Sequence, residues 1–160
     1  MPKRKFRHKV ELISGRAGLM RHPNRELIAL GVRQPWAELI LRGIKTIEVR
    51  SQGTRVRGPI YLYSPKRPAE MAAARAAAEK FEVDFESLAY GRLVGVVEIV
   101  DSRDCRARDA EAACVPSELL RGRVGWGLAN PQRLETPLEP RFLPYGVWFY
   151  PFRRRNGAAR

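Results

Sequence analysis

The densest group of side chains that could do chemistry in this sequence is formed by Lys45, Glu48 and Arg50. They follow Gly43 in the pattern G-x-K-x-x-E-x-R. In a strand over residues 46–50, Glu48 and Arg50 point to the same face because side chains alternate along a strand. We expect Lys45, at the start of that strand, to project beside them. The spacing therefore predicts a carboxylate held between an ammonium and a guanidinium.

Two interpretations of this group follow from charge alone. A carboxylate flanked by two cations stays ionised, so Glu48 is suited to accept hydrogen bonds from a base edge or to assist proton transfer. The alternative is a salt-bridged strand with solvated ends. The spacing does not decide between them.

Elements on both sides are expected to hold this segment in place. A short buried strand covers residues 27–32, and Pro35 then begins a helix at a position where its missing N–H costs nothing. Apolar residues from Trp36 to Ile40 follow helical spacing and face the core. Gly43 is suited to the left-handed stop of that helix. For Trp36 both a core position and a place beside a cleft remain open.

The rest of the chain predicts several more short strands and one clear helix. We expect strands at 60–64, 93–100, 125–128 and 147–150, a helix at 70–81, a charged irregular segment at 101–120 and a proline-rich connection at 131–144. A total of about five or six short strands with helices between them predicts an α+β fold, specifically a small β-barrel with helices packed around it.

The positive charge is concentrated at the two ends of the chain. The 160 residues carry a net charge of +13, of which residues 1–25 hold +7 and residues 153–160 hold +4. We therefore expect a basic flexible arm over 1–25, a folded domain over 26–152 and a basic tail over 153–160. Within the domain, residues 33–67 carry +6, so its own positive face contains the Lys45 to Arg50 segment.

Basic arms beside a basic face favour a polyanionic partner, and nucleic acid in particular. A solvated surface with tails that only aid solubility is the alternative. Membrane binding is disfavoured because neither tail has an apolar face, and no apolar run reaches the roughly 20 residues that span a bilayer. Without a secretion signal, we expect a cytoplasmic location. Cys105 and Cys114 lie in a charged segment far from both histidines, so we expect free thiols and neither a metal nor a cofactor.

The sequence also resembles a known family. Gln34-Pro35-Trp36-Ala37, then Gly43 to Ser51 (GIKTIEVRS), Arg57-Gly58-Pro59 and Trp126 to Pro131 (WGLANP) together are similar to the ASCH domain of the PUA-like superfamily. The likeness is greatest to the ASCH domain of the activating signal cointegrator 1 proteins, and it covers residues 27–150.

The resemblance implies a PUA-like β-barrel and a polar cleft that binds nucleic acid, RNA more than DNA. We also expect a monomer. The binding residues carried over from the resemblance and from the surrounding charge are Arg33, Gln34, Trp36, Lys45, Glu48, Arg50, Ser51, Arg55, Arg57, Ser64, Lys66 and Arg67. Some relatives are enzymes, so a metal-independent ribonuclease or a hydrolase of a modified base such as N4-acetylcytidine, with Lys45 and Glu48 as the catalytic pair, is one alternative. A protein-interaction module is the other.

Overall fold

A curved sheet of six strands forms the body of the protein. The computed structural model describes residues 11–15 and 18–154, and the sheet has the strand order β4-β7-β6-β5-β3-β8. Its strands are β3 (Ala29–Gly31), β4 (Ile47–Arg50), β5 (Gly58–Ser64), β6 (Arg92–Asp104), β7 (Val124–Leu138) and β8 (Trp148–Phe149). Only β3 and β5 pair in parallel, and the other pairs are antiparallel. The predicted α+β class is confirmed.

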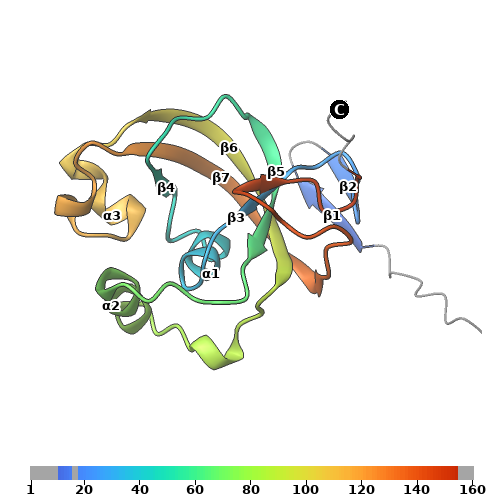
Figure 1. The fold of residues 1–160 in the computed structure, drawn as a ribbon, viewed down its shortest axis with the longest axis horizontal. Helices are drawn as coiled ribbons and strands as arrows, with labels where there is room; N and C mark the ends of the chain where they lie inside the picture. The colour runs from blue at the N-terminus through green and yellow to red at the C-terminus, as the bar shows by residue number, and fades with distance from the viewer. Residues whose placement is uncertain (1–10, 16–17, 155–160) are drawn as a thin grey trace, which may run out of the picture.

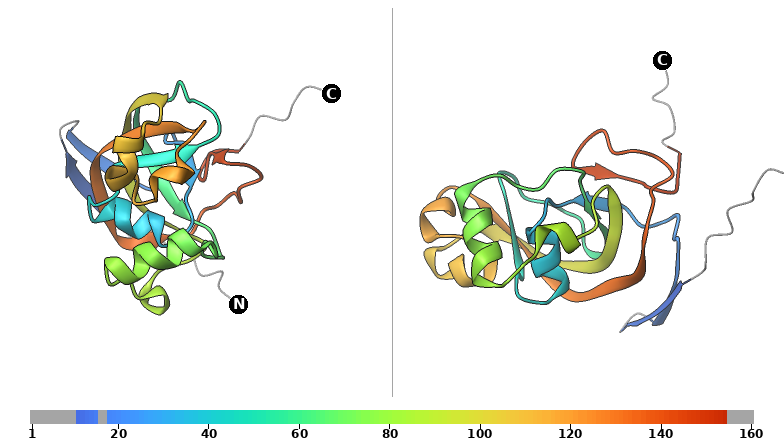
Figure 2. Two further views of the ribbon diagram at one scale, coloured as in Figure 1. Left: turned by 90° about the vertical axis from the view of Figure 1, so that its left-hand side faces the viewer. Right: turned by 90° about the horizontal axis from the view of Figure 1, so that it is seen from below.

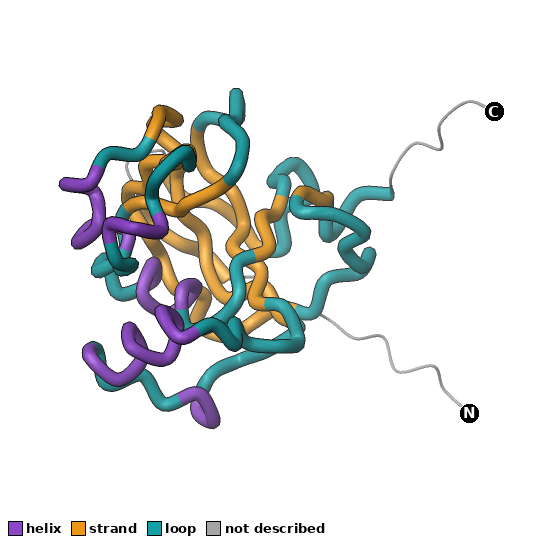
Figure 3. The backbone as a smooth tube through the Cα atoms, turned by 60° about the vertical axis from the view of Figure 1, so that its left-hand side comes forward, coloured by secondary structure: helices purple, strands orange, loops and turns teal. Residues whose placement is uncertain are grey.

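The sheet is curved but it is not a closed barrel. Among the described residues β4 and β8 are its two edge strands, and no backbone ladder joins them. Side chains close the seam instead, because the rings of Trp126 and Trp148 stack across it at 5.6 Å. Figure 3 shows the strands curling around the interior, with the helices gathered on one side. The expected barrel therefore exists as a curved sheet whose seam is sealed by side chains.

Strand β7 is longer than the sequence predicts. It runs through residues 131–138, where the prolines led us to expect a loop, and it stays paired with β6 to Leu138. Asn130 adopts a left-handed backbone with φ 50°, and the β6–β7 register shifts at this point. A bulge of this kind leaves a residue of the strand unpaired in the hydrogen-bond ladder. Pro131, which has no backbone N–H, can therefore lie within β7 without breaking a hydrogen bond to β6.

The helices cover one end of the sheet. They are α1 (Trp36–Leu41), α2 (Ala72–Lys80) and α3 (Ala110–Ala113), with single 3-10 turns η1 (Phe85–Ser87), η2 (Ala107–Asp109) and η3 (Ser117–Leu119). Figure 1 shows α2 and α3 at the end of the body that lies opposite the β1–β2 pair. The segment 101–120, expected to be mostly irregular, begins as the end of β6 and holds three of these short helical elements.

Two short strands lie in the described part of the chain before residue 26. Strands β1 (Glu11–Gly15) and β2 (Gly18–His22) pair with each other as a separate sheet, and Figure 2 shows them beside β7. His22 is buried, and its Nδ1 lies 2.7 Å from the Tyr61 hydroxyl on β5. The expected arm over 1–25 thus contains a strand pair in its described residues. Residues 1–10 and 155–160, which carry most of the expected basic ends, lie outside the described residues.

Helix α1 sits on the concave side of the sheet and fixes the position of the segment that follows it. Its residues are buried, and it approaches β6 so closely that a Cβ on Gly95 would lie 2.3 Å from Leu41. The helix ends at Leu41, and the predicted left-handed residue follows at Gly43, whose φ is 74°. The backbone N–H groups of Ile44 and Lys45 then both donate to the Leu39 carbonyl. These two hydrogen bonds fix the backbone between α1 and the start of β4.

Candidate functional site

A cleft of about 690 Å³ opens where β4 faces the end of β3 across the seam of the sheet. Four of the predicted binding residues line it. Its full lining is Gly31, Val32, Arg33, Trp36, Glu48, Val49, Arg50, Pro65, Ala69, Glu70, Met71, Gly146 and Val147. These residues come from four separate stretches of the chain, so the cleft exists only in the folded protein.

Glu48 is a buried carboxylate in the wall of this cleft, with 6% of its surface exposed. Its Oε1 accepts a 3.0 Å hydrogen bond from the backbone N–H of Val49. Its Oε2 is buried and accepts no hydrogen bond from any described residue. A buried carboxylate oxygen normally has a donor, because leaving it without one costs free energy. Glu48 therefore lines the cleft and has one buried carboxylate oxygen without a donor among the described residues.

Arg50 lies beside Glu48, as the alternation along β4 predicts. Its Nη2 is 3.8 Å from Glu48 Oε2, which is an ion pair beyond hydrogen-bond distance. The same Nη2 donates a 2.8 Å hydrogen bond to the Gly31 carbonyl on β3. The guanidinium also lies 5.5 Å from the ring centroid of Trp126. Arg50 thus spans the seam and leaves its remaining N–H groups near the cleft.

The loop between β3 and α1 supplies another wall. Arg33 is exposed at the cleft, while Trp36 borders it with only 9% of its surface exposed. Gln34 points inward: its side-chain oxygen accepts from Glu38 N at 2.9 Å, and its carbonyl accepts from Ala69 N at 2.8 Å. The resemblance implied that Gln34 lines the cleft, but the structure places it behind the wall. There its hydrogen bonds join the start of α1 to the segment that contains Ala69.

Lys45 is the main departure from the predicted site. Only 2% of its surface is exposed, and its Nζ donates a 2.6 Å hydrogen bond to the carbonyl of Ala113. The ammonium also lies over the Trp36 ring, with Nζ 5.1 Å from the ring centroid. Burial lowers the pKa of Lys45, and the charge of Glu48 opposes this lowering. The lysine is near Glu48 but supports the site from within the core.

The other predicted residues lie outside the cleft. Ser64 is fully buried and its Oγ donates to the Ala89 carbonyl, so it is part of the fold. The predicted cations and Ser51 are exposed in the loops that follow β4 and β5: Ser51, Arg55, Arg57, Lys66 and Arg67. Of these, Arg57 donates to the carbonyls of Thr54 and Val56 within its own loop. The structure thus brings four of the twelve predicted residues together and spreads the exposed ones around them.

Sequence reasoning missed the wall opposite β4. Glu70 and Met71 lie there because α2 begins at Ala72 and leaves them on the preceding turn, where both are exposed. Val147 completes the cleft because its carbonyl accepts from Gly31 N at 3.2 Å. The only signal in the sequence is a methionine directly before an alanine-rich helix. That pattern does not indicate which strand or loop Met71 would face.

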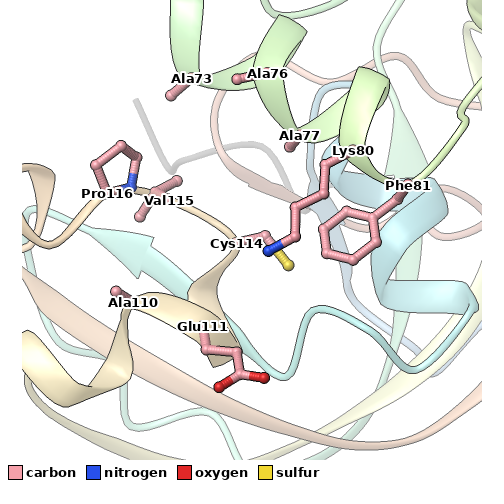
Figure 4. Close-up of a pocket in the computed structure, with 10 residues that line it drawn as sticks. All are labelled: Ala73, Ala76, Ala77, Lys80, Phe81, Ala110, Glu111, Cys114, Val115 and Pro116. Atoms are coloured by element: carbon pink, nitrogen blue, oxygen red, sulfur yellow. The ribbon is translucent and has the colours of Figure 1, made fainter.

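A second hollow of about 420 Å³ lies between α2 and α3 and shares no lining residue with the cleft. Figure 4 shows its alanine-rich wall on α2, with Lys80 and Glu111 on opposite sides and Cys114 between them. Both cysteines are free thiols, as expected. Burial raises the pKa of Cys114, and the nearby charges of Lys45 and Lys80 oppose this. The lining of this hollow is apolar apart from Lys80, Glu111 and the Cys114 thiol.

The described part of the chain holds no group of three or more His, Cys, Asp or Glu side chains placed to bind a metal ion. No helix in this part has the length and apolar character needed to cross a membrane. The charged side chains in the lining of the cleft are Arg33, Glu48, Arg50 and Glu70.

Three kinds of comparison with known proteins agree on one family of domains. A family model of the ASCH domain matches residues 30–138, which include every wall of the cleft except Gly146 and Val147. Activating signal cointegrator 1 from Homo sapiens is 35% identical over 79 residues, which are 45% of this chain and 14% of that protein. The crystal structure of ASCH from Zymomonas mobilis superposes with a TM-score of 0.52 at 13% identity, covering 79% of this chain and 88% of that one. At this identity the structural match shows the fold alone.

Proposed function

Because this chain belongs to the ASCH domain family, in which RNA binding is common, we propose that it binds nucleic acid, preferably RNA, in the cleft beside Glu48 and Arg50. The observation that carries the proposal is the free Oε2 of Glu48 beside the Arg50 guanidinium in an open cleft. An acceptor and a donor set side by side match the paired groups on the edge of a nucleobase. An exposed base could enter from a single strand, where bases are not held in a stack.

The surrounding charge supports phosphate contacts outside the cleft. Arg33 lies at the cleft itself, and Lys66 and Arg67 are exposed on the turn that follows Pro65 in its wall. Contacts of this kind position the backbone without reading sequence. The basic residues near both ends of the chain add sequence-independent attraction in the same proposal.

The position of Lys45 weighs against the catalytic alternative. A general acid or base must reach the proton that it moves, whereas the Lys45 ammonium is buried and donates to the Ala113 carbonyl. We therefore propose binding without turnover. Incubation of RNA with the protein in the presence of a chelator tests this, since intact RNA is expected. Cleavage that Lys45→Met abolishes in a folded protein would make the enzyme the better account.

Binding itself is tested with a fluorescent eight-nucleotide RNA of mixed sequence, by anisotropy at several salt concentrations. We expect binding that weakens as salt rises, and a further loss in Arg33→Ala, whose side chain is exposed at the cleft. Arg121→Ala is the matched control, because Arg121 is exposed and does not line the cleft. An affinity that is absent, or that falls equally in both variants, would contradict binding in the cleft.

A further inference from the structure

The free oxygen of Glu48 carries information about which base the cleft accepts. A carboxylate can only accept hydrogen bonds, so the group that meets Oε2 must be a donor. The neighbouring side chains do not supply this donor. Arg50 Nη2 is 3.8 Å away and bonds to Gly31, while Lys45 Nζ is bonded to Ala113. A ligand group that reaches Oε2 from the cleft would supply the missing hydrogen bond.

Nucleobases differ in the donors that they present. Cytosine, adenine and guanine carry an amino group that projects beyond the ring, next to an acceptor that can face Arg50. Uracil has only a ring N–H recessed between two carbonyl oxygens. A carboxylate that approaches this N–H also approaches both carbonyls, which repel it. The acceptor-only chemistry of Glu48 thus discriminates between the two pyrimidines, which have the same size.

The walls of the cleft suit a flat ring. Val32, Trp36 and Met71 offer apolar surface, and the volume of about 690 Å³ is within the range of sites for small molecules. Glu70 is a second carboxylate at the cleft, but it is exposed to solvent. Water can satisfy Glu70, so only the buried Glu48 gains a hydrogen bond that it otherwise lacks.

Resting on the proposed function, we infer that the cleft selects nucleobases that carry an amino group, through a hydrogen bond to Glu48 Oε2, and that it disfavours uracil. In this arrangement Arg50 donates to the acceptor next to the amino group. The phosphate contacts outside the cleft are indifferent to the base, so they set the affinity and Glu48 sets the preference.

The test compares oligo(C) and oligo(U) RNA of eight nucleotides by anisotropy at one salt concentration. We expect the wild-type protein to bind oligo(C) about tenfold more tightly than oligo(U). In Glu48→Gln, the amide can still accept from Val49 N but also offers a donor that uracil O4 can use. The ratio should therefore fall to about one or reverse. Glu118→Gln is the matched control: Glu118 is exposed and does not line the cleft, so this variant should keep the wild-type ratio.

A second measurement needs no variant. Wild-type protein is titrated with oligo(C) whose amino groups each carry two methyl groups, which removes the donor hydrogens, and its affinity should fall to that of oligo(U). Equal binding of oligo(C) and oligo(U) by the wild type overturns the inference alone. An unchanged ratio in folded Glu48→Gln does the same. Absence of binding to either oligonucleotide overturns the proposed function together with this inference.

Discussion

The Arg50 guanidinium donates a 2.8 Å hydrogen bond to the Gly31 carbonyl, and this bond joins β4 to β3 across the seam of the sheet. The two strands are far apart in the sheet order, with β7, β6 and β5 between them. One side chain therefore closes the curved sheet and shapes the cleft at the same place. Stability and binding are coupled at Arg50.

Arg50→Ala should lower the free energy of unfolding by about 2 kcal/mol, because it removes a charge-assisted hydrogen bond and leaves the buried Glu48 carboxylate without its nearest cation. Urea denaturation measures this change. Arg57→Ala is the control: Arg57 also donates to backbone carbonyls, but it is exposed, so its loss should change stability by less than about 0.5 kcal/mol. Equal effects would show that Arg50 does not close the seam.

Lys45→Met should destabilise the protein more at pH 10 than at pH 7. The substitution leaves the buried Ala113 carbonyl without its donor, at a cost of about 1–3 kcal/mol, but it also removes a desolvated charge. Burial lowers the pKa of Lys45 in the folded state below the value of about 10.4 in the unfolded chain. Between these two values the unfolded chain binds more protons, so wild-type stability rises with pH relative to the variant. Denaturation at both pH values checks this, and a difference that narrows toward pH 10 would contradict it.

Asp109 anchors the segment that carries Ala113 to the sheet. Its carboxylate accepts two hydrogen bonds from the Arg103 guanidinium, at 2.8 and 2.9 Å, and a third from Arg106 N. The hydrogen bonds from Arg103 and from Arg106 N hold the pKa of Asp109 well below its usual range. This contribution is present above the unfolded pKa of about 3.9 and is lost as the pH falls below it.

Asp109→Asn should therefore be less stable than the wild type at pH 7, and the gap should shrink as the pH falls from about 4 toward 2. Thermal unfolding across that range measures the gap. Asp104→Asn is a suitable control because Asp104 is exposed at the end of β6. A gap for Asp109→Asn that stays constant with pH would contradict the role of its ionised form.

Removing residues 1–10 and 155–160 should weaken binding to oligo(C) and oligo(U) alike. These residues carry seven basic side chains and no acidic one. The slope of log affinity against log salt for a single strand should become shallower by about 0.7 for each phosphate contact that the deletion removes. The oligo(C) to oligo(U) ratio should not change. A slope that stays the same after the deletion would show that the basic ends do not contact the nucleic acid.

Much of the fold and part of the site follow from the sequence, because both rest on local patterns. The helix stop at Gly43 and the alternation along β4 place Glu48 and Arg50 side by side, as predicted. Long-range packing decides the rest. The burial of Lys45 depends on Ala113, which is 68 residues away, and no local pattern shows that contact. The extension of β7 through Pro131 depends on a bulge against β6.

The most direct test of the central claim is an NMR titration of ¹⁵N-labelled protein with the eight-nucleotide oligo(C) RNA. If the nucleic acid binds in the cleft, the largest shifts should fall on the backbone amides of Val32, Val49, Arg50 and Val147 and on the indole N–H of Trp36, which all belong to the cleft lining. Shifts confined to the hollow between α2 and α3, or to exposed basic loops with the cleft signals unchanged, would contradict the claim.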